Sequence, residues 1–435
     1  MKRQDAMSEL TGTFRLTPAD IAEIVSGFHA EMRRGLSGEQ SSLKMLPSFV
    51  AKPRGSETGN YLALDLGGTN LRVLAVELEG AGKSRVLAVD KFVVPGALMC
   101  GKGEDLFDFL ADCVLTFAGK VGAGSAGGLR LAFTFSFPTE QTRVDSGRLV
   151  AWTKGFTATG VQGEDVVDLL TRSLRRKGAG FVRIVALVND TVGTLAARGY
   201  ADPACDVGVI LGTGTNACYS EEILRITKNR NLGAGGEMIV NMEWGNFALL
   251  RRTPFDLDLD RHSPNPGSQL LEKTVSGMYL GELSRRVIRA LVNEGLLFPG
   301  AGRDLFATPY AFRTEHMSAL AANDPGVLAA FGIDDPTEND RGLLADVCRA
   351  ISLRSARIVG AALAAVITWM DPELIRPHTV GIDGSLFEHY PGYPGDIRGA
   401  LADALGPRAD RVRLELAKDG SGIGAAVIAA VAGTD

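Results

Sequence analysis

The sequence has few cysteines, no excess of basic residues and no long apolar run, and each shortage argues against a class of protein. Lysine and arginine total 46 against 51 aspartates and glutamates, a formal net charge of −5. We therefore expect neither nucleic acid nor a membrane as a partner. No zinc or CxxC spacing occurs, and we expect all the cysteines to be buried, reduced thiols of a cytoplasmic protein. The cysteines are Cys100, Cys113, Cys205, Cys218 and Cys348.

The sequence also lacks apolar segments of the kind that direct secretion or cross a membrane. The N-terminal residues lack the apolar segment of a secretory signal. The longest apolar runs, 360–370 and 423–433, are too short to span a bilayer and are predicted to be buried helices. His262 and His389 have no metal-ligand spacing and are predicted to lie at the surface.

Glycine is abundant, with 53 residues in a chain of 435, which indicates tight turns and close backbone approaches. A helix is predicted over 17–35, with Thr17 as its N-cap and Gly35 just after its end. Three strands forming a meander follow, and then helices alternate with strands. These elements are predicted at 61–66, 71–78, 85–94, 104–117 (helix), 131–137, 164–176 (helix) and a strand that ends at 188.

The pattern then restarts with strands at 206–211, 216–220 and 238–241, helices at 269–294 and 343–369, and strands at 379–382 and 412–416. The hairpins 66–70 and 211–216 align as Leu-Gly-Gly-Thr-Asn and Leu-Gly-Thr-Gly-Thr-Asn, which indicates a duplication of whole domains. We therefore predict an α/β protein of two lobes with a cleft between them. The small domain is placed at 60–188 plus 420–435, and the large domain at 1–59 plus 189–419.

Both Gly-rich hairpins are candidate phosphate-binding loops. Glycine lets backbone amides approach a phosphate, and threonine and asparagine supply further donors. Asp65, at the end of the first strand, could hold Mg²⁺ through water. The alternative for each loop is an ordinary hairpin turn. A near-match to the P-loop at 96–103 has Gly103 where Ser or Thr would bind Mg²⁺, so we interpret it as a strand-to-helix connection.

An acid–base candidate and several sugar-binding candidates follow apolar segments. Asp190, beside Asn189, comes directly after a strand and could accept a hydroxyl proton during phosphoryl transfer; its alternative is a helix N-cap. Planar polar side chains suit vicinal sugar hydroxyls. Glu272 has an ordinary exposed helix position as its alternative. The polar candidates in apolar surroundings are Ser136, Thr153, Lys154, Asn216, Glu243 and Glu272.

These segments, in this order, resemble the hexokinase and glucokinase family of eukaryotic type. The resemblance runs from the first helix to 418–424. It is carried by 64–70 with Arg72, 133–138, 152–156, 188–193, 211–216, 243–245, 265–267 to 272–273, and 383–388.

The resemblance implies an actin-like ATPase (ribonuclease H-like) fold, with a mixed five-stranded sheet in each lobe, and ATP-dependent phosphorylation of a hexose. Asp190 would be the catalytic base, with Lys154 near the sugar and the transferred phosphoryl group. ATP, with Mg²⁺ organised by Asp65, would be the co-substrate. Hexose would be bound by Ser136, Thr153, Lys154, Asn189, Asp190, Asn216, Glu243 and Glu272. The nucleotide would be bound by Asp65, Gly67, Gly68, Thr69, Asn70, Arg72, Gly212, Thr213, Gly214, Thr215, Gly384, Ser385 and Ser421.

The sequence departs from the family pattern at Leu71, where an aromatic is usual, at Ser268, where Gln is usual, and in 239–242, which lacks a common Thr. These changes could retune the sugar pocket. The length fits one catalytic unit, as a monomer or homodimer. The alternatives are a kinase for another hexose, a catalytically silent sugar sensor, and an actin-like filament protein.

Overall fold

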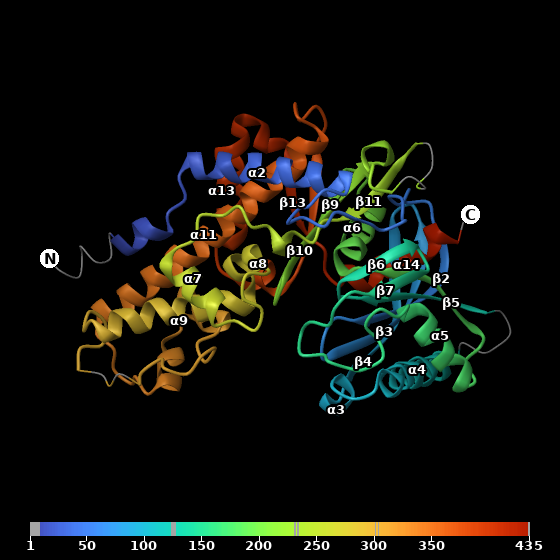
Figure 1. Ribbon diagram of the computed structural model, residues 1–435, viewed down its shortest axis with the longest axis horizontal. Helices are drawn as coiled ribbons and strands as arrows, with labels where there is room; N and C mark the ends of the chain where they lie inside the picture. The colour runs from blue at the N-terminus through green and yellow to red at the C-terminus, as the bar shows by residue number, and fades with distance from the viewer. Residues whose placement is uncertain are drawn as a thin grey trace.

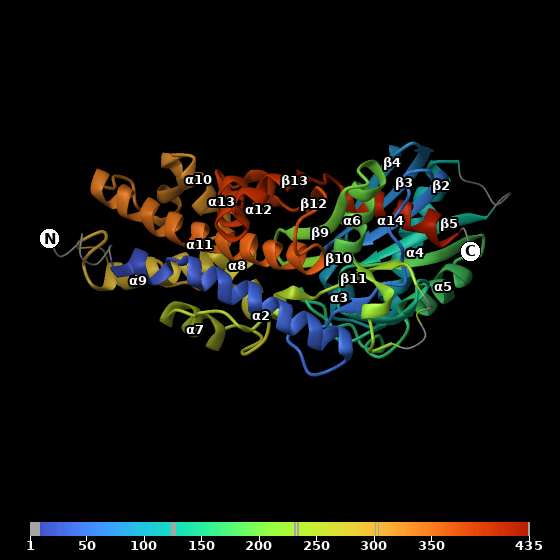
Figure 2. The same cartoon turned by 90° about the horizontal axis from the view of Figure 1, so that it is seen from above.

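The computed structural model describes residues 9–122, 128–229, 232, 235–300, 302 and 304–433. Two β-sheets follow one another along the long axis, and helices pack around each (Figures 1 and 2). We name the two halves by the predicted domains, the small lobe (60–188 and 420–433) and the large lobe (9–59 and 189–419). Residues 1–8 and 434–435 of the predicted domains lie outside the described residues.

The small-lobe sheet has five strands in the order β4-β3-β2-β5-β8. They are β2 (Thr58–Leu66), β3 (Asn70–Gly80), β4 (Lys83–Val93), β5 (Leu129–Phe135) and β8 (Val182–Val188). β2, β3 and β4 form the predicted antiparallel meander, and β5 and β8 continue the sheet in parallel with β2. A separate hairpin of β6 (Thr139–Arg143) and β7 (Ser146–Leu149) follows β5 in the chain.

The large-lobe sheet repeats this arrangement, in agreement with the predicted duplication. β9, β10 and β11 form an antiparallel meander, and β12 and β13 follow in parallel with β9. They are β9 (Cys205–Leu211), β10 (Thr215–Glu222), β11 (Glu237–Asn241), β12 (His378–Asp383) and β13 (Val412–Leu416). This sheet has six strands and not the predicted five, because the two-residue strand β1 (Leu46–Pro47) pairs with the edge of β11.

Helices cover both faces of the small-lobe sheet and bury the large-lobe sheet. α4 and α5 pack on one face of the small-lobe sheet, and α14 packs on the other. The small-lobe helices are α3 (Gly96–Met99), α4 (Gly103–Lys120), α5 (Val166–Arg176) and α14 (Gly420–Ala432). The large-lobe helices are α2 (Pro18–Ser37), α6 (Asp190–Ala201), α7 (Pro254–Arg261), α8 (Leu270–Val275), α9 (Gly277–Asn293), α10 (Thr314–Ala321), α11 (Glu338–Met370), α12 (Ser385–His389) and α13 (Tyr393–Leu405). Short 3-10 turns are η1 (Ile223–Arg225), η2 (Trp244–Asn246), η3 (Pro325–Phe331) and η4 (Gly406–Arg411).

Two helix boundaries differ from the sequence predictions. α2 has the predicted Thr17 cap, but it continues past Gly35 and ends at the left-handed Gly38 (φ 82°). Gly35 is required for packing, since a Cβ there would lie 2.4 Å from the carbonyl oxygen of Leu43. The single helix predicted at 269–294 is two helices, α8 and α9, separated at the extended residue Ser276.

Three features noted in the sequence have structural outcomes. Among the described residues, one helix, α11, is long and apolar enough to cross a membrane, and 83% of its most apolar window is buried inside the protein. It is therefore a core helix of the large lobe. Four cysteines are buried as predicted, but Cys100 is exposed, because it lies in the turn after α3. The P-loop-like segment is α3 and the start of α4, a strand-to-helix connection as predicted.

α6 and α14 pack against each other between the two sheets. Glycines allow their backbones to touch, and a Cβ on Gly424 would lie 1.8 Å from the carbonyl oxygen of Gly193. The apolar cluster around the pair includes Ala132 of β5 and Cys218 of β10, so it draws on both sheets. This helix pair therefore joins the two lobes.

Candidate active site

Asp190 is the first residue of α6 and follows β8 directly. The N-cap of α6 is Asn189, whose Oδ1 accepts hydrogen bonds from the backbone N–H (3.0 Å) and hydroxyl (2.6 Å) of Thr191. Asp190 Oδ1 also accepts from the Thr191 N–H (2.9 Å). Because Asn189 caps the helix, Asp190 is not its N-cap. The hydrogen bond from the Thr191 N–H instead holds the Asp190 carboxylate at the start of the helix.

The surroundings of Asp190 make its carboxylate more basic than usual. Burial raises the pKa of Asp190, the ammonium of Lys154 opposes this rise, and the charge of Asp65 adds to it. The nearby side chain of Ser136 has a smaller effect, which lowers the pKa of Asp190. A carboxyl group with a raised pKa beside a fixed cation is a common arrangement of a general base.

Lys154 is presented by a loop that aromatic side chains hold against the small lobe. Trp152 stacks on Phe156 (5.2 Å between ring centroids) and meets Phe137 edge-on (4.9 Å). Lys154 itself has a left-handed backbone (φ 55°), and its Nζ donates to the Ser136 carbonyl (2.8 Å). Thr153, next to it, is exposed. The loop therefore delivers Lys154 to the vicinity of Asp190.

The large lobe contributes two carboxylates that interact electrostatically with Asp190 and Lys154. Burial raises the pKa of both Glu243 and Glu272. Glu243 lies after β11 with a left-handed backbone (φ 53°), and its Oε1 accepts from the side-chain amide of Asn216 (3.3 Å). Lys154 of the small lobe is therefore close enough to Asp190, Glu243 and Glu272 to interact with all three electrostatically.

Thr215 has a different environment from the one predicted for a phosphate-binding residue. Its side chain is buried, its hydroxyl accepts from the Trp244 indole N–H (2.9 Å) and its backbone N–H donates to Glu272 (3.0 Å). Protein partners therefore occupy both the hydroxyl and the backbone N–H of Thr215, which is already the first residue of β10. Thr215 therefore supports Glu272.

The two Gly-rich hairpins lie at corresponding ends of the two sheets. The first, Gly67 to Asn70, is largely exposed, with Gly68 at φ 147° beside the Lys154 side chain. In the second, Gly212 accepts from the N–H of Gly277 (2.8 Å), and Thr213 accepts from the next N–H of α9 (3.1 Å). Gly214 lies against Glu272. The start of α9 therefore fixes this hairpin, which explains the break between α8 and α9.

Gly384 and Ser385 border the second hairpin. Gly384 has φ 128°, and a Cβ there would lie 2.3 Å from the carbonyl oxygen of Leu211. Only glycine fits this close approach of backbone to backbone. The turn after β12 is thereby held against Gly212.

Asp65 and Arg72 face each other across the β2–β3 ladder. The guanidinium of Arg72 pairs with Asp65 Oδ2, with Asp419 (2.9 Å) and with the Ser421 hydroxyl (2.8 Å). Ser421 is buried and donates to the same Asp65 oxygen (3.0 Å). Arg72 and Ser421, both predicted to bind nucleotide, therefore also hold Asp65 in place.

Asp65 fits the predicted Mg²⁺ role through its other oxygen, Oδ1, which lies toward Gly67. Within the described ranges, no group of three or more His, Cys, Asp or Glu side chains is arranged to hold a metal ion. A single carboxylate suits a Mg²⁺ that is carried by nucleotide phosphates and keeps most of its water.

Two acidic residues at the site were not singled out from the sequence. Asp383, the last residue of β12, interacts with Arg72 and with Asp190. Burial, opposed by Arg72, raises the pKa of Asp383 to about 6. Asp419 pairs with Arg72 as described above. Each of the two aspartates precedes a glycine in a segment that carried the family resemblance. This position in the sequence could have marked them as candidate site residues.

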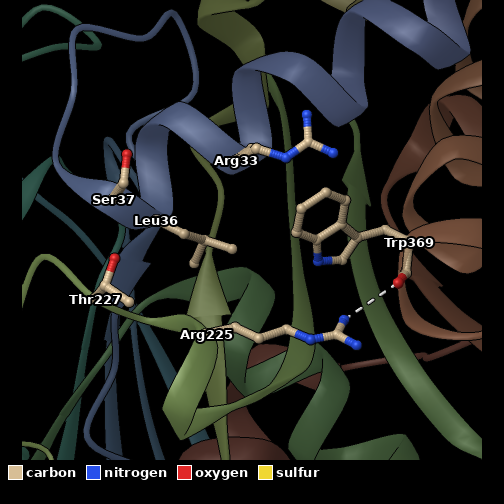
Figure 3. Close-up of a pocket in the computed structure, with 6 residues that line it drawn as sticks. All are labelled: Arg33, Leu36, Ser37, Arg225, Thr227 and Trp369. Carbon is tan, nitrogen blue, oxygen red and sulfur yellow. Dashed lines mark hydrogen bonds between the residues drawn. The ribbon is translucent and has the colours of Figure 1, made fainter.

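A hollow of about 420 Å³ lies apart from these residues, on the large lobe (Figure 3). It is lined by Arg33, Leu36 and Ser37 of α2, by Arg225 and Thr227, and by Trp369 of α11. Arg225 donates to the Trp369 carbonyl (3.3 Å). None of the predicted site residues lines this hollow. His262 and His389 are at the surface as predicted.

Sequence comparison identifies the family. The two hexokinase domain descriptions match residues 6–200 and 206–431. The chain belongs to the hexokinase family. It is 40% identical to human hexokinase-3 over 98% of its length and 41% identical to human hexokinase-1 over 96%. The chain spans 47% of the length of each of these relatives, about half.

Solved hexokinase structures have the same fold. The hexokinase from Schistosoma mansoni complexed with glucose superposes with a TM-score of 0.88, at 36% identity and with 99% of both chains covered. A second hexokinase crystal structure gives a TM-score of 0.85 at 32% identity, again covering 99% of both chains. These likenesses confirm the predicted fold class.

Proposed function

We propose that this chain transfers the γ-phosphoryl group of ATP to the 6-hydroxyl of a hexose, with D-glucose as the expected acceptor. The products would be hexose 6-phosphate and ADP, as in the first step of glycolysis, in the cytoplasm. One observation supports the assignment: Lys154, held on the Ser136 carbonyl of the small lobe, is close enough to Asp190, Glu243 and Glu272 to interact with them electrostatically. The glucose in the complex of the Schistosoma relative supports a hexose as the acceptor.

The residues divide the chemistry between them. Asn189, Asn216, Glu243 and Glu272, with Ser136 and Thr153, would bind and orient the sugar. Asp190 would take the proton of the sugar 6-hydroxyl. At the same time the hydroxyl oxygen would form a bond to the γ-phosphorus, and the bond between the γ-phosphorus and the ADP oxygen would break. Lys154 and the amides of both hairpins would stabilise the charge on the phosphoryl oxygens.

The nucleotide side is organised by the hairpins. Asp65 would hold Mg²⁺ through water, and the ion would neutralise charge on the β- and γ-phosphates when ATP binds. Thr69, Asn70, Thr213 and the turn at Ser385 would border the nucleotide. Closure of the two lobes would exclude water, which otherwise competes as the acceptor.

A panel of sugars tests this function. We expect ATP-dependent ADP release with glucose, measured as initial rates, and a lower kcat/KM with fructose, mannose and glucosamine. Chelation of Mg²⁺ by EDTA should abolish the activity, and added Mg²⁺ should restore it. ADP release that is independent of every hexose would contradict a sugar kinase, and ATP-dependent sedimentation would favour a filament protein.

A further inference from the structure

Asn241 contacts two of the proposed hexose-binding residues. It is the last residue of β11 and is buried, with 7% of its surface exposed. Its Oδ1 accepts from Asn216 Nδ2 (2.8 Å), and its Nδ2 donates to Glu243 Oε1 (2.9 Å). Asn241 thus links the amide of one candidate to the carboxylate of the other.

The backbone fixes the direction of every hydrogen bond in this chain of side chains. Asn216 Oδ1 accepts from the N–H groups of Ala217 (2.7 Å) and Trp244 (3.3 Å), so its Nδ2 must face Asn241. Because Nδ2 can only donate, Asn241 must present Oδ1, which also accepts from the Glu243 N–H (3.3 Å). Asn241 Nδ2 is then left to donate to Glu243 Oε1. Oε1 is therefore an acceptor, and it also accepts directly from Asn216 Nδ2 (3.3 Å).

We propose that Asn241 is a positioning residue for hexose binding, which fixes Glu243 through Oε1 and leaves Oε2 to accept a sugar hydroxyl. This inference rests on the proposed function and specifies how its sugar site is held.

The charges around Glu243 support this role. Burial raises the pKa of Glu243, and the hydrogen bond from Asn241 lowers it. Lys44 and Lys154 favour the ionised form, whereas Asp190 opposes it. The nearby carboxylate of Glu272 interacts with Glu243 as well. With two carboxylates opposing ionisation, the donor on Asn241 helps to keep Glu243 in the form that can accept from a sugar.

The variant Asn241→Ala tests the positioning role. Removal of a hydrogen bond to a charged group should raise the Kd and KM for glucose by about tenfold to a hundredfold. The KM for ATP should remain within about twofold of wild type, because the side-chain hydrogen bonds of Asn241 go to candidate hexose-binding residues. Glucose binding is measured by calorimetry without ATP, and Asn60→Ala on the exposed part of β2 is the matched control.

The isosteric variant Asn241→Asp gives a signature that a merely structural role would not produce. The aspartate keeps an acceptor for Asn216 but places a second carboxylate next to that of Glu243. Because two adjacent carboxylates repel each other, they should share one proton at lower pH. Glucose affinity of this variant should be very weak at pH 8.5 and should improve toward pH 6.5, whereas that of wild type should not improve.

The outcomes separate the inference from the function on which it rests. Wild-type binding with both Asn241 variants within about twofold of it, at both pH values, would overturn the inference alone. A wild-type chain that neither binds nor phosphorylates a hexose would overturn the proposed function and the inference with it. Weakened binding of Asn241→Ala together with pH-dependent recovery of Asn241→Asp supports the positioning role.

Discussion

Replacement of Asp190 by Ala should lower kcat for hexose phosphorylation by about 10²–10⁴-fold, the usual contribution of a positioned base. The neutral, isosteric Asp190→Asn should lose a similar factor, because it cannot accept the hydroxyl proton. Hexose binding should change far less, since the other sugar-binding residues remain. A coupled ADP assay and calorimetric hexose binding measure the two effects separately.

The stability of the Asp190 variants distinguishes loss of chemistry from loss of fold. Burial raises the pKa of Asp190, so the ionised group is less stable in the folded than in the unfolded chain. Above that pKa the carboxylate therefore lowers the free energy of unfolding, and Asp190→Asn should unfold at or above the wild-type temperature. Asp168→Ala, an exposed aspartate in the first turn of α5, is the matched control. An Asp190 variant with turnover within about threefold of wild type would exclude this residue as the base.

The second large effect is expected at Gly424. An alanine Cβ there would lie 1.8 Å from the carbonyl oxygen of Gly193 and 2.7 Å from its Cα, both backbone atoms that cannot rotate away. We expect Gly424→Ala to lower the free energy of unfolding by about 3 kcal/mol, at the upper end for overpacked sites. It should also lower kcat, because α6 carries Asp190. Urea unfolding and the ADP assay measure the two losses.

Gly399→Ala is the control for the effect of glycine itself. Gly399 lies in α13 with nothing within 4 Å of its ideal Cβ. The alanine should stabilise the chain by about 0.5–1 kcal/mol, the helix preference of alanine over glycine. If Gly424→Ala behaved like Gly399→Ala, the close contact of α6 and α14 would be wrong.

The sequence was a good guide wherever a local pattern determines the structure. Thr17 caps α2, the two hairpins end apolar strands, and the meanders follow the predicted order, because strand alternation, caps and glycine turns are read from neighbouring residues. The candidate hexose-binding and nucleotide-binding residues stand mostly at the ends of such elements, where a pattern in the sequence can single them out, and their roles stay predictions.

Contacts between distant segments were the part that the sequence could not reveal. Gly35 resembles a helix end, but it is retained inside α2 by the approach of Leu43. The break at Ser276 depends on the hairpin at Gly212, more than sixty residues earlier by their numbers. β1 has only two residues, too few for a strand signal, and exists because β11 offers it an edge. Thr215 and Asn241 likewise have roles that appear only once their partners are assembled.

The glycine contact of α6 with α14 has a mechanical consequence. One helix starts at Asp190 and the other near Ser421, which anchors Asp65 and Arg72. Because the backbones of the two helices are in contact, the helices could rotate relative to each other but could not move apart. We therefore expect the distance between Asp190 and Ser421 to stay nearly constant as the lobes close. The candidate base and the candidate nucleotide-binding residues that Ser421 anchors would therefore keep their alignment when the lobes close over a sugar.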